Sequence, residues 1–423
     1  MYDVISIGAG SGGLNIASFM NSIGLNVLLV DKTDKNIGGD CLNYGCIPSK
    51  SLIHISKLFA NAKESEKYGA TFRKKAYINK IMDTIKKKQD AIRKHENAKY
   101  FRDKGIDVAF GFAKFMSKNT IIVNKDVYVA KRIIITTGSR PKRLDVPGSQ
   151  KIDILTNETI FDINKLPEKF LVIGGGPIGI ELGQAFSRLG SKVTIVQSGS
   201  RILTKEDPSI SDILLKRLKK EGINVILDSK LTEFPSKNIA MIADEKGRPQ
   251  KIHFDAVLSS IGRKLNIDGL DVEKAGIRLD QNKRLKLDKH FRTTNKRVYV
   301  VGDAAGKHMF THAAELHAQA VINNLFSPIK KTVKEKEMAW VTYTDPEVAT
   351  FGYTEERLRE LDKTFLKYEV PFEDEDRAIT DDNRDAKLIL FLDKKKCILG
   401  GTMISRNAGE LVQELILAKD NKI

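Results

Sequence analysis

One arrangement of apolar runs and glycines limits the possible folds of this chain more than any other feature, because it occurs twice. In its first copy, an apolar run over residues 2–7 leads into the sequence GAGSGG at 8–13. A helical pattern follows over 14–23, and a second apolar run covers 27–31. This order predicts a βαβ unit, in which a tight turn joins a strand to a helix and the next strand lies parallel to the first.

The second copy comes about 166 residues later in the chain. An apolar run over 170–173 leads into GGGPIG at 174–179, a helical pattern ends at Leu189, and another apolar run covers 192–197. Two such units favour the α/β class with two doubly wound, dinucleotide-binding domains. The length of 423 residues is enough for about three domains.

The three spaced glycines of each copy have separate roles in a dinucleotide-binding turn. They allow a tight turn, a close approach of the backbone to a pyrophosphate, and close packing of helix on strand. The amides at the helix N-terminus then face the phosphates. A glycine turn without a nucleotide is the alternative, and it is much weaker for two copies than for one. The residues expected to bind dinucleotides here are Gly8, Gly10, Ser11, Gly12 and Gly13 in the first copy, and Gly174, Gly176, Pro177, Ile178 and Gly179 in the second.

The residue at the end of the second apolar run in each copy indicates whether the bound nucleotide carries a 2′-hydroxyl or a 2′-phosphate. Asp31 can accept hydrogen bonds from a ribose 2′-hydroxyl, as an adenosine without a 2′-phosphate requires. Gln197 stands at the corresponding position of the second copy, and a neutral amide leaves NADH and NADPH both open. Arg201 is close enough in sequence to reach a 2′-phosphate, but a surface salt bridge or a helix-end contact explains it equally well.

Two cysteines follow the first βαβ unit, in the sequence CLNYGCIPSK at 41–50. Cys41 and Cys46 lack a second ligand pair at metal-like spacing, so we expect no zinc site and instead a candidate redox disulfide. Residues five apart on a regular helix do not converge, so the segment must be distorted, and Gly45 and Pro48 permit this.

A helix is expected to begin near Pro48 and to run through Lys50 to Leu58. This start places Cys46 near a helix N-terminus, which favours the reactive thiolate. Two structural, buried cysteines are the alternative. Cys397 is interpreted as a plain strand residue.

The charge balance is strongly basic, with 71 Lys and Arg against 54 Asp and Glu, a net charge of +17. Residues 71–104 carry about half of this excess, beginning with Arg73, Lys74 and Lys75. Apolar residues recur there at helical spacing and predict one long amphipathic helix with a solvated lysine face. These residues are Ile78, Ile81, Met82, Ile85 and Ile92. The alternative is a helix that docks on acidic protein or nucleic acid, but no nucleic-acid module with interleaved aromatics is present.

No apolar run approaches the roughly 20 residues of a membrane-spanning helix. The first residues, MYDVISIGAG, lack the basic head and cleavage site of a secretory signal. We therefore expect a cytoplasmic protein without a membrane partner.

With these and further motifs, the chain closely resembles the class I pyridine nucleotide–disulfide oxidoreductases. Within that family it looks most like the branch of dihydrolipoamide dehydrogenases and mercuric-reductase-like enzymes. Besides GAGSGG and CLNYGCIPSK, the resemblance rests on TTGSRP at 136–141, GGGPIGIE at 174–181, SIGR at 260–263, VGDA at 301–304, YTDPE at 343–347, FTHAAE at 310–315 and AGEL at 408–411. It implies an FAD-binding domain over 1–145, an NAD(P)H-binding domain over 146–266, a central part returning to FAD over 267–335, and an α+β dimerisation domain over 336–423 of a homodimer.

The resemblance also implies roles for single residues. Cys46 matches the flavin-side thiol and Cys41 the thiol that attacks the substrate disulfide, while Lys50 and Glu181 match a pair beside the flavin. Asp303 matches the acid that binds the ribityl chain, and a surface charge or capped helix end is the alternative for Asp303 and Glu181. Further residues expected to bind the cofactors are Lys32, Gly39, Asp40, Ala113, Thr137, Gly138, Gly262, Arg263, Gly302, Thr311, His312 and Ala313.

The implied activity is an electron relay from NAD(P)H through FAD to the Cys41–Cys46 disulfide and then to an external disulfide or dithiol, small or protein-bound. An NAD(P)H oxidase or diaphorase and a mercuric-reductase-like enzyme are alternatives, as is a non-catalytic protein that docks through its basic helix. Pro177 stands where glutathione reductases have a gating tyrosine, which argues against glutathione. The lack of a C-terminal cysteine pair and of an N-terminal metal-binding domain argues against mercury.

One part of the family pattern is missing. Disulfide-reducing members carry a His followed closely by a Glu near the C-terminus, and no such pair follows Ala408 before the sequence stops at Ile423. We expect a shortened last domain, with slow thiol exchange and intact flavin reduction. An incomplete chain, a degraded gene and a short form with another acceptor are the three explanations. His317 is a possible substitute, but a structural or surface role on a helix is favoured.

Overall fold

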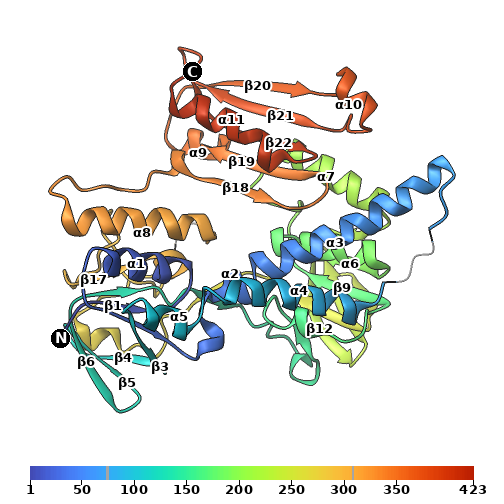
Figure 1. Ribbon diagram of the computed structural model, residues 1–423. Coiled ribbons are helices and arrows are strands. Elements are labelled where there is room, and N and C mark those ends of the chain that lie inside the picture. The colour runs from blue at the N-terminus through green and yellow to red at the C-terminus, as the bar shows by residue number, and fades with distance from the viewer. Residues whose placement is uncertain (73–75, 307–308) are drawn as a thin grey trace. The chain divides into compact units, whose positions relative to one another are not determined.

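The computed structural model describes residues 1–72, 76–306 and 309–423. Its contacts divide the chain into two compact units, each built from three segments (Figure 1). The first unit comprises Met1–Pro48, Thr84–Arg140 and Arg263–Val333, and the second comprises Ser49–Asp83, Pro141–Gly262 and Lys334–Ile423.

A seven-stranded sheet forms the centre of the first unit. Its parallel strands lie in the order β3 (Asp107–Phe110), β2 (Val27–Asp31), β1 (Tyr2–Ile7), β6 (Asp126–Ile135) and β17 (Val298–Val300). β5 (Thr120–Val123) and β4 (Ala113–Ser117) extend it antiparallel from β6. The central strands β1, β2 and β17 are rich in Val, Ile and Leu and are mostly buried, as strands covered on both faces should be.

Two helices pack together on this sheet, α1 (Ser11–Ser22) and α8 (Thr311–Phe326), which lie side by side in Figure 1. Their approach is close because α1 presents glycine to α8 and to the chain that precedes it. A Cβ on Gly12 would lie 2.6 Å from Val301 Cγ1 and 3.7 Å from Ala314 Cβ. The core of the unit therefore extends from β1 and β2 through α1 to α8.

The second unit contains three sheets. The five strands of the first are parallel, in the order β11 (Asn224–Ile226), β10 (Lys192–Val196), β9 (Lys169–Ile173), β15 (Ala256–Ser259) and β8 (Ile154–Leu155), with the helices α6 (Pro177–Leu189) and α7 (Pro208–Lys220). β12 (Ser229–Ser236), β13 (Ile239–Asp244) and β14 (Pro249–His253) form a small antiparallel sheet. A further pair, β7 (Ser139–Pro141) and β16 (Arg263–Leu265), lies where the chain passes between the units.

The third sheet of this unit is antiparallel, in the order β18 (Ala339–Thr342), β19 (Glu347–Gly352), β22 (Ile398–Ser405), β21 (Lys387–Leu392) and β20 (Leu366–Pro371). α11 (Ala408–Asp420) packs on β19 and β22 through Ala408 and Val412. The short helices α9 (Glu355–Glu360) and α10 (Asp376–Thr380) connect its strands.

Both predicted βαβ units are present, and α1 and α6 begin directly at their glycine turns. The cysteine segment is broken, as expected. Two residues separate α2 (Gly39–Asn43) from α3 (Cys46–Glu64), so Cys46 is the first residue of a helix that runs to Glu64.

The prediction of a single long basic helix over residues 71–104 was wrong. The structure has α4 (Ile78–Arg93) and α5 (Ala98–Asp103), and the Asn97 side chain between them accepts a hydrogen bond from the Tyr100 amide, which starts a new helix. Ile78, Ile81, Met82 and Ile85 are buried on α4, whereas Ile92 is only half-buried. Arg73, Lys74 and Lys75 lie outside the described residues.

Two smaller expectations have different outcomes. Cys397 precedes β22 in a loop and is not a strand residue, because its amide donates to the Asp393 carboxylate in a turn. His317 is buried on α8 against the Phe291 ring, which confirms a structural position. Among the described residues, no helix is long and apolar enough to cross a bilayer.

Candidate redox site and dinucleotide turns

The first glycine turn is closed by a threonine at the end of β6. The Thr136 hydroxyl donates hydrogen bonds to the carbonyls of Gly8 (2.7 Å) and Ile7 (3.0 Å). A Cβ on Gly8 would lie 2.4 Å from the Thr136 carbonyl oxygen, and one on Gly13 would lie 2.0 Å from the Gly8 carbonyl oxygen. Only glycine fits at these two positions, which bring α1 onto the strand ends.

The second turn repeats this arrangement with a serine. The Ser260 hydroxyl donates to the carbonyls of Gly174 (3.0 Å) and Ile173 (2.9 Å). A Cβ on Gly174 would lie 2.5 Å from the Ser260 carbonyl oxygen, and one on Gly179 would lie 2.2 Å from the Gly174 carbonyl oxygen. The two units thus build their turns from the same contacts.

Asp31, the last residue of β2, and Gln197, the residue after β10, make the same contact in the two units. Asp31 Oδ2 accepts a hydrogen bond from the Ala9 amide (2.7 Å), and Gln197 Oε1 accepts one from the Gly175 amide (2.8 Å). Burial raises the pKa of Asp31, although the amides that bond it oppose the rise. Arg201 donates to the Glu206 carbonyl, so its observed contact is with backbone.

Both turns have features that fit a dinucleotide phosphate. No side chain caps the N-terminus of α1 at Gly10 or of α6 at Gly176, so backbone amides remain for an anion. Nothing lies within 4 Å of a Cβ built on Gly176 or Gly138. In the described part of the chain, the buried Thr137 hydroxyl beside Gly138 has no hydrogen-bond partner. These residues therefore fit the groups expected there, FAD at the first turn and NAD(P) at the second.

A partly buried cluster of polar side chains joins Ser139 to Arg263 and Asp303, which the sequence analysis assigns to cofactor binding. Ser139 Oγ donates to Asp303 Oδ2 (2.5 Å), and Arg263 Nε donates to Ser139 Oγ (2.6 Å). Arg263 also lies 3.3 Å from an Asp40 oxygen and 3.7 Å from Asp303. Burial raises the pKa of Asp303, while the Ser139 hydroxyl and the Arg263 charge oppose the rise. Asp303 is thus held by the fold and is not a surface charge.

The two cysteines are free thiols in contact with each other across the break between α2 and α3. Cys46 Sγ lies 3.3 Å from the Thr311 hydroxyl at the start of α8. The pKa of the Cys41 thiol is raised by its hydrogen bond to Cys46, then by burial and by the charge of Cys46. In the reduced pair Cys41 therefore keeps its proton when Cys46 is ionised.

Lys50 and Glu181 form an ion pair in the second unit. Lys50 Nζ lies 2.9 Å from Glu181 Oε2 and 4.5 Å from the centre of the Tyr343 ring. The other carboxylate oxygen of Glu181 accepts a hydrogen bond from the Tyr343 amide (2.8 Å). Lys50 is also one helical turn after Cys46 on α3, the helix that runs from the first unit into the second.

The sequence analysis missed two residues on α6 that bind Asp345, two positions after Tyr343. Gln184 and Arg188 follow Glu181 on the same face of α6, at the spacing i, i+3 and i+7. Gln184 exchanges two hydrogen bonds of 2.9 Å with the backbone of Asp345, and Arg188 pairs with the Asp345 carboxylate at 3.0 Å. Polar residues at helical spacing in an otherwise apolar helix are the signal that could have revealed them.

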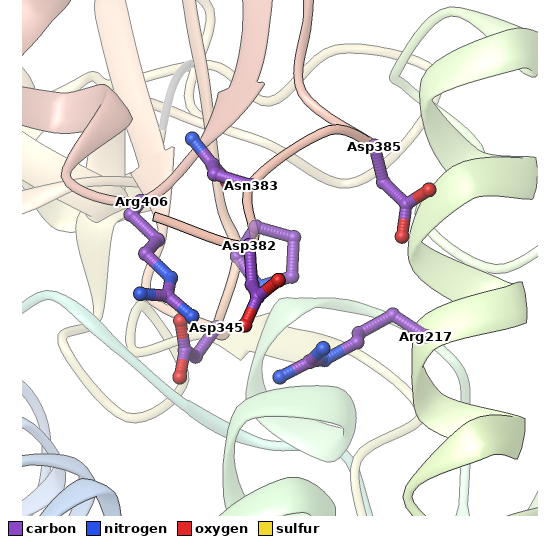
Figure 2. A pocket seen from close by; sticks show the side chains of 7 residues that line it. Arg217, Asp345, Asp382, Asn383, Asp385 and Arg406 are labelled. Atoms are coloured by element: carbon purple, nitrogen blue, oxygen red, sulfur yellow. The ribbon is translucent and has the colours of Figure 1, made fainter. Parts of the chain in front are cut away.

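Burial disfavours the charge of Asp345, but Arg188 and Lys57 outweigh this effect and hold its pKa below the usual range. The segment that contains Asp345 also lines a pocket of about 320 Å³ that includes open solvent. Figure 2 shows the Arg217 side chain extending from α7 toward Asp345 and Asp382, with Arg406 on the other side. No residue expected from the sequence to bind a cofactor lines this pocket.

The remaining predicted residues are placed as follows. The Lys32 amide donates to Asp31, Ala113 is buried at the start of β4, and Ile178 is in the first turn of α6. A Cβ built on Gly39 would lie 2.6 Å from Gly10 Cα, so Gly39 closely approaches the first glycine turn. Gly262 and Gly302 have left-handed backbones, and His312 and Ala313 lie in the first turn of α8, where the His312 ring stacks on Phe310.

Two family models match the chain. Residues 2–318 match the model described as pyridine nucleotide-disulphide oxidoreductase, and residues 338–423 match the dimerisation domain of that family.

Curated relatives of two kinds are similar over nearly the whole chain. Dihydrolipoyl dehydrogenase from Mycoplasma genitalium is 31% identical, with 100% of this chain and 93% of that protein covered. Mercuric reductase from Bacillus cereus is 30% identical, with 99% of this chain covered but only 66% of that protein.

Among solved structures, the HOCl-induced flavoprotein disulfide reductase RclA from Escherichia coli superimposes with a TM-score of 0.86 at 24% identity. The match covers 99% of this chain and 93% of that one and supports the same fold. With two dinucleotide turns, a cysteine pair and matches to both family models, the chain belongs to the class I pyridine nucleotide–disulfide oxidoreductases, the FAD- and NAD(P)-dependent flavoproteins.

Proposed function

We propose that this protein exchanges electrons between NAD(P)H and a disulfide or dithiol substrate of the lipoamide type, with Cys41 and Cys46 as its redox-active pair. The observation that carries the proposal is the contact between these thiols at the start of α3, in the same unit as the first glycine turn. The similarity to dihydrolipoyl dehydrogenase over 93% of that protein supports the substrate class.

The proposal assigns the first turn, Asp31, Thr137 and Asp303 to FAD, and the second turn with Gln197 to NAD(P). When bound, FAD supplies two-electron exchange between a nicotinamide and a disulfide. We also propose the four domains given above, 1–145, 146–266, 267–335 and 336–423, as the functional division of the chain.

The protein's own residues have distinct tasks in this proposal. Cys46 holds negative charge at the start of α3, where the helix N-terminus favours a thiolate. Cys41 keeps its proton until it meets the substrate disulfide. Lys50 provides a positive charge that Glu181 holds in place, and the Tyr343 amide holds Glu181. Glu181 is buried, and both of its carboxylate oxygens are engaged, one by Lys50 and the other by the Tyr343 amide.

The test compares Cys46→Ser and Cys41→Ser with the unchanged protein. In the unchanged protein, reduction by NADH without oxygen should give a long-wavelength charge-transfer band. Cys41→Ser, which has no disulfide to reduce, should show this band before NADH is added, and Cys46→Ser should not show it at all. Turnover of lipoamide should fall to background in both variants, while NADH oxidation by ferricyanide should persist. Equal rates of oxygen consumption and lipoamide turnover in the unchanged protein would contradict the proposal in favour of an NAD(P)H oxidase.

A further inference from the structure

The chain that follows β10 wraps around one residue of the second glycine turn. Gln197 Oε1 accepts a hydrogen bond from the Gly175 amide (2.8 Å), and the Leu203 amide donates to the Gly175 carbonyl (2.9 Å). Ile202 and Leu203 are buried and anchor the end of this segment. Residues 197–203, the β10 loop, therefore lie against the turn to which the proposed function assigns NAD(P), and all of these contacts are within the second unit.

The Gln197 side chain presents its amide nitrogen to the β10 loop. A backbone amide donates only to an acceptor, so the bond from Gly175 occupies Gln197 Oε1 and leaves Nε2 on the other side of the group. A Cβ on Gly199 would lie 3.3 Å from Gln197 Nε2, which places this nitrogen beside the middle of the loop. Among the described residues, none accepts a hydrogen bond from it.

Arg201 brings a positive charge to the same loop. It is half-buried, and its only side-chain hydrogen bond within the described chain runs from Nη1 to the Glu206 carbonyl (3.4 Å). No carboxylate of the described residues forms an ion pair with its guanidinium. The sequence of the β10 loop, QSGSRIL, contains no acid. The loop thus offers hydrogen-bond donors from Gln197 and Arg201.

The acids that flank the loop are engaged elsewhere. Glu206 is buried, and both of its oxygens accept hydrogen bonds from the last sheet, while Asp207 pairs with Lys367 at 2.9 Å. Asp228 reaches the loop through its amide, which donates to the Gly199 carbonyl (3.1 Å). In the described part of the chain, no carboxylate therefore bonds a side-chain donor of the β10 loop.

The first unit has the opposite chemistry at the equivalent position. Asp31 is a carboxylate, and its oxygens accept hydrogen bonds from the amides of Ala9 (2.7 Å) and Lys32 (2.6 Å). Such a group accepts the hydrogen of a ribose 2′-hydroxyl and repels a 2′-phosphate. Gln197 carries no charge and presents a donor instead. Because an ionised phosphate only accepts hydrogen bonds, a 2′-phosphate matches the donors of the β10 loop better than a hydroxyl does.

We propose that the second turn selects NADPH over NADH, with Gln197 Nε2 and the Arg201 guanidinium donating hydrogen bonds to the 2′-phosphate. This inference rests on the proposed function, because that function assigns the second turn to NAD(P). It does not depend on which disulfide is the substrate. Hydrogen bonds to a charged group are the strong ones, so we expect a preference of about tenfold.

The direct test measures nucleotide binding to the full-length, FAD-loaded protein by isothermal titration calorimetry. Adenosine 2′,5′-bisphosphate carries the 2′-phosphate, adenosine 5′-monophosphate lacks it, and adenosine 3′,5′-bisphosphate has the same charge at another position. The 2′,5′-bisphosphate should bind about tenfold more tightly than either of the others. Equal or weaker binding of the 2′,5′-bisphosphate, or no binding of any of the three, would overturn the inference.

Substitutions test the two residues separately. Gln197→Glu keeps an oxygen for the Gly175 amide but adds a negative charge, so the affinity for the 2′,5′-bisphosphate should fall by about 100-fold while that for the monophosphate should not fall. Arg201→Gln should lower the affinity for the 2′,5′-bisphosphate by about tenfold. Lys205→Gln is the matched control, because Lys205 is an exposed cation just beyond the loop, and it should leave this affinity unchanged.

The remaining outcomes are equally decisive. If Gln197→Glu weakens the monophosphate and the 2′,5′-bisphosphate alike, Gln197 only supports the turn and the inference fails. If Lys205→Gln weakens the 2′,5′-bisphosphate as much as Arg201→Gln does, general charge attraction replaces the role of Arg201. Ferricyanide reduction should show the same preference, as a higher kcat/KM with NADPH than with NADH.

Failure of the proposed function has a different signature. In that case neither coenzyme supports lipoamide turnover, whereas the order of nucleotide affinities and its response to Gln197→Glu still report on the β10 loop. A preference for NADH in the binding and ferricyanide measurements, together with rapid lipoamide turnover, would overturn the coenzyme inference and leave the proposed function intact.

Discussion

Glu206 is a buried carboxyl group that no motif identifies. Its two oxygens accept hydrogen bonds from the Trp340 indole (2.6 Å) and the Thr350 hydroxyl (2.5 Å). Burial raises the pKa of Glu206, although these hydrogen bonds oppose the rise. The folded protein therefore prefers the protonated form more than the unfolded chain does. The resulting contribution to stability is complete below the ordinary pKa and is lost as pH rises through the folded-state pKa.

Replacing Glu206 by Gln should remove this dependence. The free energy of unfolding of Glu206→Gln, relative to that of the unchanged protein, should increase as pH rises above 4.5, the ordinary pKa of this carboxyl group. Thermal unfolding followed by circular dichroism at several pH values measures the difference. Glu245→Gln, at an exposed position, should show no such trend. A difference that stays constant with pH would show that Glu206 does not change protonation on folding.

At the scale of elements, α6 depends on a glycine that touches the preceding strand end. A Cβ on Gly179 would lie 2.2 Å from the Gly174 carbonyl oxygen and 2.5 Å from Ser260 Oγ, whereas one on Gly176 would have no neighbour within 4 Å. Gly179→Ala should therefore lower the free energy of unfolding by about 1–3 kcal/mol, the usual cost of overpacking. Gly176→Ala should leave it nearly unchanged.

Chemical denaturation measures both variants, and intrinsic fluorescence from the single tryptophan, Trp340, in the same unit follows the transition. Nearly equal stability of the two variants would mean that α6 moves to accept the methyl group. NAD(P)H binding serves as a separate readout, because both glycines also belong to the proposed nucleotide turn.

The sequence predicted the elements that follow a local pattern of glycines and apolar residues. It did not predict features that depend on a capping bond or on contacts between residues far apart in the chain. Both βαβ units and the break at the cysteines follow from glycine spacing and apolar runs. The basic segment is divided into two helices because the Asn97 side chain caps the start of α5. The spacing of apolar residues alone does not show whether such a cap interrupts a helix. Likewise, the bonds that Gln89 and Arg93 on α4 make to the backbone and a side chain of α2 join residues about 45 to 50 positions apart, which no local pattern reveals.

At the scale of the whole molecule, the last sheet leaves an apolar edge uncovered. Every residue of β20 is exposed, and Leu366, Tyr368 and Val370 share one face of that strand. Leu411 and Leu417 are exposed on α11. An exposed edge strand with an apolar face can pair with another chain, and these residues belong to the family's dimerisation domain. We therefore expect a homodimer.

Light scattering after size-exclusion chromatography should give twice the 47.3 kDa mass of one chain. Replacing Tyr368 and Val370 together by Lys should shift the protein toward the mass of one chain. Met116→Lys, at an exposed apolar position on β4, should not. A single-chain mass for the unchanged protein would rule out the expected dimer.

Gly13 and Gly179 face the same steric restriction in the two halves of the chain, so an experiment at one position can be repeated at the other. A substitution that only crowds the backbone should lower the free energy of unfolding by a similar amount at either position. A substitution that also removes a bound molecule should have different effects at the two positions. Comparing counterparts within one chain can thus separate injury to the backbone from loss of a ligand, without reference to any other protein.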